Sequence, residues 1–330
     1  MMRRYAVMFV CVVLVSVAVS LAAAAGDGGR VRVGLAWQPK AAAYDRVVLS
    51  IEAAGGEAVI LPQLRPAGFD YDSTALCPKY TDEMGVLRQE YADIVKRETY
   101  HGTQADSLLA SVQAVVFLGG GDISSTLLAQ PQPWHGIAED SPANATRDVS
   151  EYLTMSYCLD HDIPVLGLCR GMQMLGVVSG APLIQDLGKY FDEMGKSYHF
   201  LHRMERDAEG KRYYTPHDVL VTDHSSLLYA LAGTDTIRNV PSWHHQVVGD
   251  VTGTPLRVTA ITPTDGIAII EAIERTDKRF ALGVQYHPEE AIKQHVKGQA
   301  GASRFMPIDE AVKYFVALIA ASRASQEVRP

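Results

Sequence analysis

The sequence has no excess of positive charge. Its 330 residues include 30 lysines and arginines against 38 aspartates and glutamates, a formal net charge of −8. The basic residues form no stripe along the chain. Proteins that bind nucleic acid gather such residues on one surface to neutralise phosphates. We therefore expect no nucleic-acid partner.

Internal repeats and Pro/Ser-rich linkers are also lacking. Without a linker there is no natural place to divide the chain, and its length is enough to bury one large core. We predict a single domain over residues 26–330. Symmetric assemblies are common among soluble proteins, so an even-numbered homo-oligomer is the base-rate expectation.

Cysteine is scarce, with four in the whole chain. Cys11 lies in the apolar N-terminal run, which leaves Cys77, Cys158 and Cys169. In an oxidising compartment three thiols allow one disulfide and leave one thiol over. If Cys169 is that thiol, the pair is Cys77–Cys158. A small buried residue on a helix explains Cys158 equally well, so the disulfide stays open.

Sequence patterns for phosphate and zinc binding are absent. The glycine run 119–121 is followed by no Gly-Lys-Ser/Thr, and no G-x-G-x-x-G opens a helix. Adjacent His244 and His245 have no further ligands at zinc spacing. The remaining histidines are scattered and are interpreted as surface or structural residues: His199, His202, His217 and His224. We expect neither a metal nor an organic cofactor.

Residues 1–25 have the pattern of a secretory signal peptide. Arg3 and Arg4 precede an apolar run, which ends in the small residues Ala22 to Ala25. This predicts export to a periplasmic, extracellular or lumenal compartment, with no stable membrane span after cleavage. The alternative is an uncleaved anchor, because the apolar run is about long enough to cross a bilayer.

Strand and helix patterns alternate through much of the remaining chain. Residues 31–37 read as a buried strand, 44–56 as a helix stopped by glycine, and 57–62 as a second strand. Such β-α-β order predicts a mostly parallel, doubly wound α/β sheet, which binds ligands at the carboxyl ends of its strands. Two polar stretches, near 63–103 and 185–215, interrupt the pattern and are predicted to be insertions that shape the pocket.

The stretch Gly167-Leu-Cys169-Arg-Gly171 joins an apolar strand to a helix. A sharp turn there would raise the side chain of Cys169 above the sheet edge, as in a nucleophile elbow. The helix N-terminus favours a thiolate, and the backbone N–H of Arg170 can face an oxyanion. A tight turn with a buried cysteine is the simpler alternative for this stretch alone.

Two further stretches favour the reactive thiol. His287-Pro-Glu289 follows an apolar strand and supplies a base with a carboxylate to orient it. Gly119, Gly120 and Gly121 end another strand, where their backbone N–H groups could stabilise an oxyanion. Together with Cys169 these residues form a candidate Cys-His-Glu triad.

These stretches, in this order, resemble the class I glutamine amidotransferase family, and within it the γ-glutamyl hydrolase branch that includes γ-glutamyl-γ-aminobutyrate hydrolase. Further matching segments are "AAGGEAVILP", "RDVSEYL", "SWHHQVV" and "DGIAIIEAIE". The resemblance covers most of residues 26–330 and implies a flavodoxin-like fold with a nucleophile elbow.

The resemblance also implies roles for individual residues. Cys169 would be the nucleophile, His287 the general base and acid, and Glu289 the orienting carboxylate. Arg170 and a glycine among 119–121 would form the oxyanion hole. Substrate contacts are implied for Gln173, Ser242, His244 and His245, although Pro241 stands where the family has asparagine. Since neighbouring residues of a strand face opposite ways, only one of the two histidines is expected in the cleft.

The leading hypothesis is an exported cysteine hydrolase that cleaves γ-glutamyl amide bonds of a small substrate through a thioester. One alternative is a glutaminase subunit that delivers ammonia to a synthetase. Another is a non-catalytic protein that binds γ-glutamyl ligands. The sequence leaves the leaving amine undefined.

Overall fold

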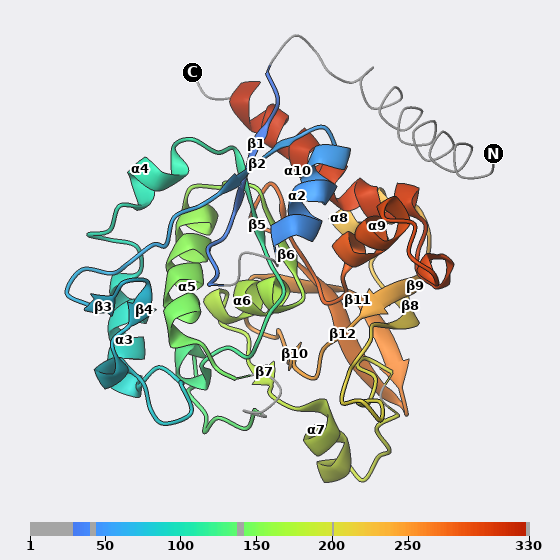
Figure 1. The fold of residues 1–330 in the computed structure, drawn as a ribbon, viewed down its shortest axis with the longest axis horizontal. Coiled ribbons are helices and arrows are strands. Elements are labelled where there is room, and N and C mark those ends of the chain that lie inside the picture. The colour runs from blue at the N-terminus through green and yellow to red at the C-terminus, as the bar shows by residue number, and fades with distance from the viewer. Residues whose placement is uncertain (1–28, 40–43, 137–141, 200, 328–330) are drawn as a thin grey trace.

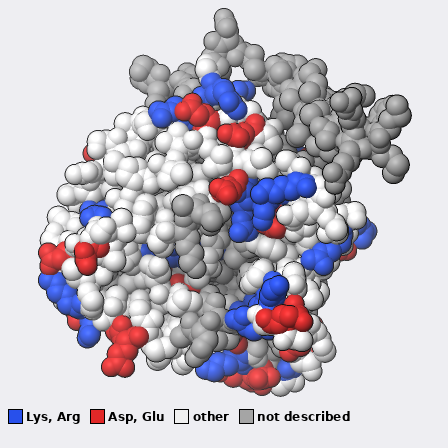
Figure 2. All heavy atoms as spheres, in the orientation of Figure 1, with Lys and Arg blue, Asp and Glu red and all other residues white. Residues whose placement is uncertain are grey.

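The computed structural model describes residues 29–39, 44–136, 142–199 and 201–327, with side chains described as far as residue 324. The predicted signal peptide lies outside the described residues. No helix within these ranges is long and apolar enough to cross a membrane. On the face drawn in Figure 2, Lys/Arg and Asp/Glu side chains are interspersed rather than gathered by sign.

A nine-stranded sheet forms the centre of the molecule (Figure 1). Its first five strands pair in parallel, and each of the other four runs antiparallel to its neighbours. The order across the sheet is β2 (Glu57–Ile60), β1 (Arg32–Leu35), β5 (Ala114–Phe117), β6 (Val165–Leu168), β13 (Ala281–Val284), β12 (Ile267–Arg275), β11 (Leu256–Thr264), β8 (Thr215–Val221) and β9 (Thr236–Ser242).

Helices cover both faces of the parallel half, as the alternating pattern predicts. Helices α5 (Ala145–Asp160) and α6 (Arg170–Val178) pack on one face, where Leu153 and Leu175 join one apolar cluster. The other face carries a second cluster. Its helices are α2 (Tyr44–Ala53), α8 (Leu227–Ala232), α9 (Pro288–Val296) and α10 (Ile308–Glu327). The doubly wound α/β fold is confirmed.

The two predicted insertions lie in different places. Residues 63–103 form β3 (Tyr71–Asp72), β4 (Ala75–Leu76), the 3₁₀ turn Pro78–Tyr80 and α3 (Gln89–Glu98), and they pack beside α5. Residues 185–215 contain α7 (Leu187–Glu193). The other short elements are α4 (Ala105–Leu109), β7 (Leu183–Ile184) paired with β10 (Val247–Val248), and the 3₁₀ turns Ser125–Leu127 and Ala302–Arg304.

The register of the parallel strands brings three predicted motifs to one edge. Phe117 of β5 pairs with Gly167 of β6, and Leu168 pairs with Val284 of β13. The chain leaves each strand within a residue or two of these pairs. The glycine run, the cysteine turn and the His-Pro-Glu segment therefore meet at the carboxyl edge, where doubly wound sheets bind ligands.

Candidate active site

Cys169 occupies a strained turn between β6 and α6. Its φ of 51° and ψ of −103° lie in a region that side-chain-bearing residues rarely adopt. The flanking glycines are needed for close packing, because a Cβ on Gly167 would lie 2.6 Å from the backbone of Gly171, and one on Gly171 would lie 2.2 Å from the Phe117 carbonyl oxygen. The predicted nucleophile elbow is confirmed as a backbone geometry.

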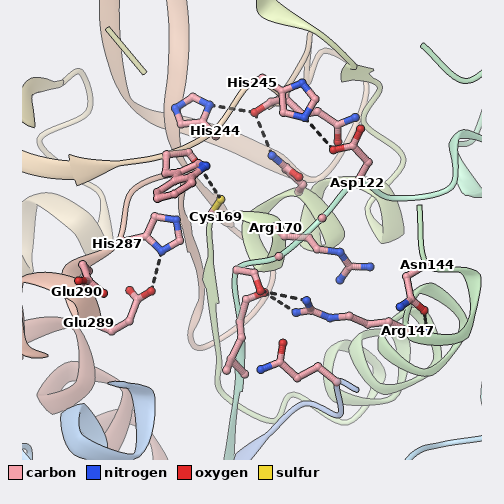
Figure 3. Close-up of a pocket in the computed structure, with 18 of the residues that line it drawn as sticks. Asp122, Asn144, Arg147, Cys169, Arg170, His244, His245, His287, Glu289 and Glu290 are labelled. Atoms are coloured by element: carbon pink, nitrogen blue, oxygen red, sulfur yellow. Dashed lines mark hydrogen bonds and ion pairs between the residues drawn. The ribbon is translucent and has the colours of Figure 1, made fainter. Parts of the chain in front are cut away.

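The thiol lies beside the predicted base. The side chains of Cys169 and His287 both lie against Gly119, and Cys169 is close enough to raise the pKa of His287; its Sγ lies 3.8 Å from the Trp243 carbonyl oxygen. On the other side of the ring, His287 Nδ1 is 2.6 Å from Oε1 of Glu289. Figure 3 shows this succession of sulfur, imidazole and carboxylate. The structure thus brings together the three residues predicted as a triad.

The charges around His287 favour an imidazolium. Burial alone lowers the pKa of His287, but Tyr214, the Glu289 carboxylate and Cys169 outweigh burial and raise it well above its usual range. Burial raises the pKa of Glu289, but the positive charges of His287 and Arg46 lower it by more. The pKa of Glu289 therefore lies below its usual range, and the carboxylate stays ionised. A positive ring between a thiol and a carboxylate suits a thiolate nucleophile.

The glycine run closes the opposite wall of the site. A Cβ on Gly119 would lie 2.7 Å from His287 Cε1 and 3.6 Å from Cys169 Cβ, so this backbone passes directly beside the reacting groups. Arg170 is the first residue of α6, and intrahelical bonding leaves such an N–H without an acceptor. Both parts of the predicted oxyanion hole therefore flank the sulfur.

A buried ion network supports that wall, and sequence analysis missed it. Arg147 donates to the carbonyl oxygens of Leu118 and Gly119 at 2.8 and 3.0 Å, and to Glu151 at 2.7 Å. The Arg170 guanidinium pairs with Glu151 and Asp148. The i, i+4 spacing of Arg147 and Glu151 indicates an ion pair on a helix from sequence alone. Their contact with Arg170, next to Cys169, depends on how α5 packs in the fold.

A cavity of about 580 Å³ opens over these groups. Gln173 lines it and donates to the Gln246 carbonyl oxygen at 3.0 Å. Arg203 and Tyr214 line it from the second insertion, whereas the first insertion contributes none of its described lining, contrary to prediction. The charged side chains of the lining are Arg46, Arg147, Arg170, Arg203, Lys293, Asp122, Glu289 and Glu290.

The predicted contacts at 242–245 need correction. Ser242 is fully buried, donates to the His202 carbonyl oxygen at 3.0 Å and does not line the cavity. The two histidines follow β9 rather than lie within a strand, and both border the cavity. His245 has Asp122 and Asp186 on its two ring nitrogens, at 2.9 and 3.1 Å. These carboxylates overcome burial and raise the pKa of His245.

The interpretation of the other histidines and cysteines is also revised. His199 and His224 are exposed, as expected, but His202 and His217 are buried and lie together with His244 around Glu271. Cys77 and Cys158 are free thiols, so the structure contains no disulfide among the described cysteines. Cys158 is buried in α5, which agrees with the hydrophobic alternative.

Comparison with known proteins identifies the family. The sequence profile of Peptidase C26 matches residues 94–289, more than half of the chain. The chain belongs to the peptidase C26 family. This C26 member is 33% identical to Protein NtpR of Enterococcus hirae over 186 residues, 56% of this chain and 70% of that protein. The family match, together with relatives named as glutamine amidotransferase-like proteins and gamma-glutamyl-gamma-aminobutyrate hydrolases, makes this chain a glutamine amidotransferase-like hydrolase.

Two further matches of this C26 protein cover different shares of the chain. Gamma-glutamyl-gamma-aminobutyrate hydrolase PuuD of Escherichia coli K12 is 30% identical over 160 residues, which are 48% of this chain and 59% of that enzyme. A glutamine amidotransferase structure from Thermotoga maritima has 14% identity and a TM-score of 0.44, and the match covers 92% of this chain and all of that one.

Proposed function

We propose that the protein is an exported cysteine hydrolase that cleaves γ-glutamyl amide bonds of small substrates. The observation that carries the proposal is the strained Cys169 beside His287, whose ring is held by Glu289, under a cavity large enough for a dipeptide-sized ligand. A site built only to bind a ligand would need neither the strained nucleophile nor the charged base.

In the first half-reaction, the Cys169 thiolate attacks the γ-carbonyl carbon and forms an S–C bond. The carbonyl oxygen becomes an oxyanion beside the N–H groups of Arg170 and the glycine run. The C–N bond then breaks, and His287 gives its proton to the leaving amine. The products of this half are a γ-glutamyl thioester and a free amine.

In the second half-reaction, neutral His287 takes a proton from water, and the resulting hydroxide equivalent attacks the thioester carbon. The S–C bond breaks, glutamate leaves, and the thiolate and imidazolium are restored. Substrate and water thus become glutamate and amine, and no other reactant is consumed. Glu289 keeps the ring oriented through both halves.

The cavity offers cationic side chains to a substrate carboxylate. Arg46, Arg203 and Lys293 line it, in addition to Arg147 and Arg170, whose guanidinium groups pair with the buried acids Glu151 and Asp148. Export is supported by the pattern of residues 1–25 alone. The names of the C26 relatives support γ-glutamyl chemistry.

The test is turnover of a panel of γ-glutamyl amides by the protein from residue 26 onward, with Cys169→Ala as the inactive partner. We expect release of glutamate that depends on Cys169. Hydrolysis by Cys169→Ala at the parent rate would refute the mechanism. Recovery of a stoichiometric synthetase from the native host would instead favour the glutaminase alternative. N-terminal sequencing of the protein from its host tests cleavage of the signal peptide.

A further inference from the structure

A second group of chemically reactive side chains lies in the antiparallel half of the sheet. His202, His217, His244 and Glu271 have side chains that are 0–1% exposed. Each offers one nitrogen or oxygen atom, and these four atoms lie within 4.8 Å of one another. They come from four separate segments: the second insertion, β8, the loop after β9, and β12.

The separations suit one small cation. Glu271 Oε1 lies 3.0 Å from His202 Nδ1, 3.6 Å from His244 Nε2 and 3.7 Å from His217 Nε2. Ligands bound to zinc at about 2.0–2.2 Å in a tetrahedron lie about 3.3–3.6 Å apart. The 3.6 Å contact of His244 falls within this range and the 3.7 Å contact of His217 lies just above it, whereas the 3.0 Å contact of His202 is shorter. Movements of the rings by less than about 1.5 Å would bring all four atoms to tetrahedral spacing.

Hydrogen bonds on the far side of each ring fix which nitrogen faces inward. His217 Nδ1 lies 3.2 Å from the Asp218 carbonyl oxygen, and His244 Nδ1 lies 3.0 Å from that of Gln246. A carbonyl only accepts, so these nitrogens carry the hydrogen and leave Nε2 as a lone pair. A hydrogen bond from the ring nitrogen that faces away from the ion is typical of histidines that bind metal.

His202 contacts a hydroxyl on its far side. Its Nε2 lies 3.1 Å from Thr264 Oγ1, which can donate or accept a hydrogen bond, and its Nδ1 lies 3.0 Å from Glu271 Oε1. Binding of a cation at Nδ1 requires the ring hydrogen on Nε2, where the Thr264 hydroxyl can accept it.

Without a cation, this arrangement is unfavourable. The inward atoms form no well-aligned hydrogen bond within the described part of the chain. Two imidazole lone pairs facing a carboxylate in a buried space would cost several kcal/mol, a cost that a divalent ion removes.

We propose that His202, His217, His244 and Glu271 bind one zinc ion in a closed structural site. Three imidazoles and one carboxylate fill a tetrahedral shell, which leaves no position for a reacting water. The ion would tie the second insertion and the loop after β9 to the sheet. That loop supplies the Trp243 and Gln246 carbonyl oxygens, which contact Cys169 and Gln173. The ion would therefore hold one wall of the cavity.

The first test is the metal content of the full chain, purified without a histidine tag and measured by plasma mass spectrometry. We expect about one zinc per chain. Dipicolinate should remove it and lower the melting temperature by at least about 5 °C, and added zinc should restore both. Less than about a tenth of an equivalent, with no thermal response to zinc, would overturn the proposal.

Matched variants locate the ion. Glu271→Gln and His217→Ala should lose zinc, whereas His224→Ala removes an exposed histidine and should keep it. Cys169→Ala should also keep it, which separates this site from the catalytic pair and from any failure of the proposed activity. Zinc retained by both cluster variants would refute the assignment. If these variants fail to fold, the unmutated protein can be loaded with cobalt in place of zinc and its visible absorption measured. A tetrahedral site gives intense cobalt absorption, and its absence would count against the proposal.

Discussion

The parallel and antiparallel halves of the sheet hold polar groups in opposite ways. In the parallel half, Cys169, His287 and Glu289 follow the ends of strands and open onto a cavity. In the antiparallel half, His217 and Glu271 lie within strands and belong to a buried cluster. The first arrangement exposes charge to a substrate, and the second encloses it. One sheet thus provides a reactive edge and a fixed wall beside it.

The largest expected effect is in the parallel half. Cys169→Ala should lower kcat/KM for γ-glutamyl amides by at least about 10³-fold, because the nucleophile is lost. Cys158→Ala removes the buried thiol of α5 and should change activity only a few-fold. Steady-state kinetics on both variants separates the two thiols. Comparable losses in both would mean that Cys169 has no special role.

The buried ion network behind the oxyanion hole gives the next effect. Asp148→Asn leaves the Arg170 guanidinium with one anionic partner fewer and should lower the free energy of unfolding by about 3 kcal/mol. Denaturant titration measures this loss of unfolding free energy, which should be the same with and without dipicolinate, the chelator that removes zinc. If the loss vanished in dipicolinate, the ion network of the parallel half would depend on the cluster in the antiparallel half.

Gly119→Ala tests the close approach of the glycine run to the base. The added Cβ would overlap His287 Cε1 at 2.7 Å, so the ring must shift. We expect kcat to fall about 10²-fold, because a small misplacement of a catalytic group is costly. Gly210→Ala, at an exposed turn of positive φ, is the control for a general effect of alanine and should leave kcat unchanged. An unchanged kcat in Gly119→Ala would contradict the geometry.

The smallest effect concerns pH. The raised pKa of His287 keeps the ring protonated to higher pH, and activity is lost as pH rises through that pKa. Glu289→Gln removes a charge that raises it, so the alkaline limb of kcat/KM should move to lower pH. Glu290→Gln should move it less, because that carboxylate pairs with Arg46 and Lys293. If the alkaline limb moved equally in Glu289→Gln and Glu290→Gln, His287 would not be paired specifically with Glu289.

Local pattern was enough to predict the parallel half. Each motif there is contiguous and directly follows an apolar strand, so strand order alone brings Cys169, His287 and the glycine run together. The helices around them were also recognised, because their apolar spacing is regular. The ion network around Arg170 escaped notice because its partners lie on α5, about twenty residues away in sequence.

The antiparallel half could not be predicted in the same way. His202, His217, His244 and Glu271 are separated by irregular intervals that match no zinc spacing. Only the paths of an insertion and a loop over the paired strands β8 to β12 bring them together. Ser242 was misassigned for a related reason: its hydroxyl turns inward to the His202 carbonyl oxygen. The position of the cluster and the inward orientation of Ser242 both depend on pairing between strands β8 and β9, for example of His217 with Val240.

The most direct test of the central claim is intact-protein mass spectrometry of a reaction quenched with acid during turnover. The mechanism predicts a fraction of the protein heavier by one glutamyl group, mapped by peptide analysis to Cys169 and absent in Cys169→Ala. A mass unchanged under all conditions, together with hydrolysis by Cys169→Ala, would contradict covalent catalysis by this residue.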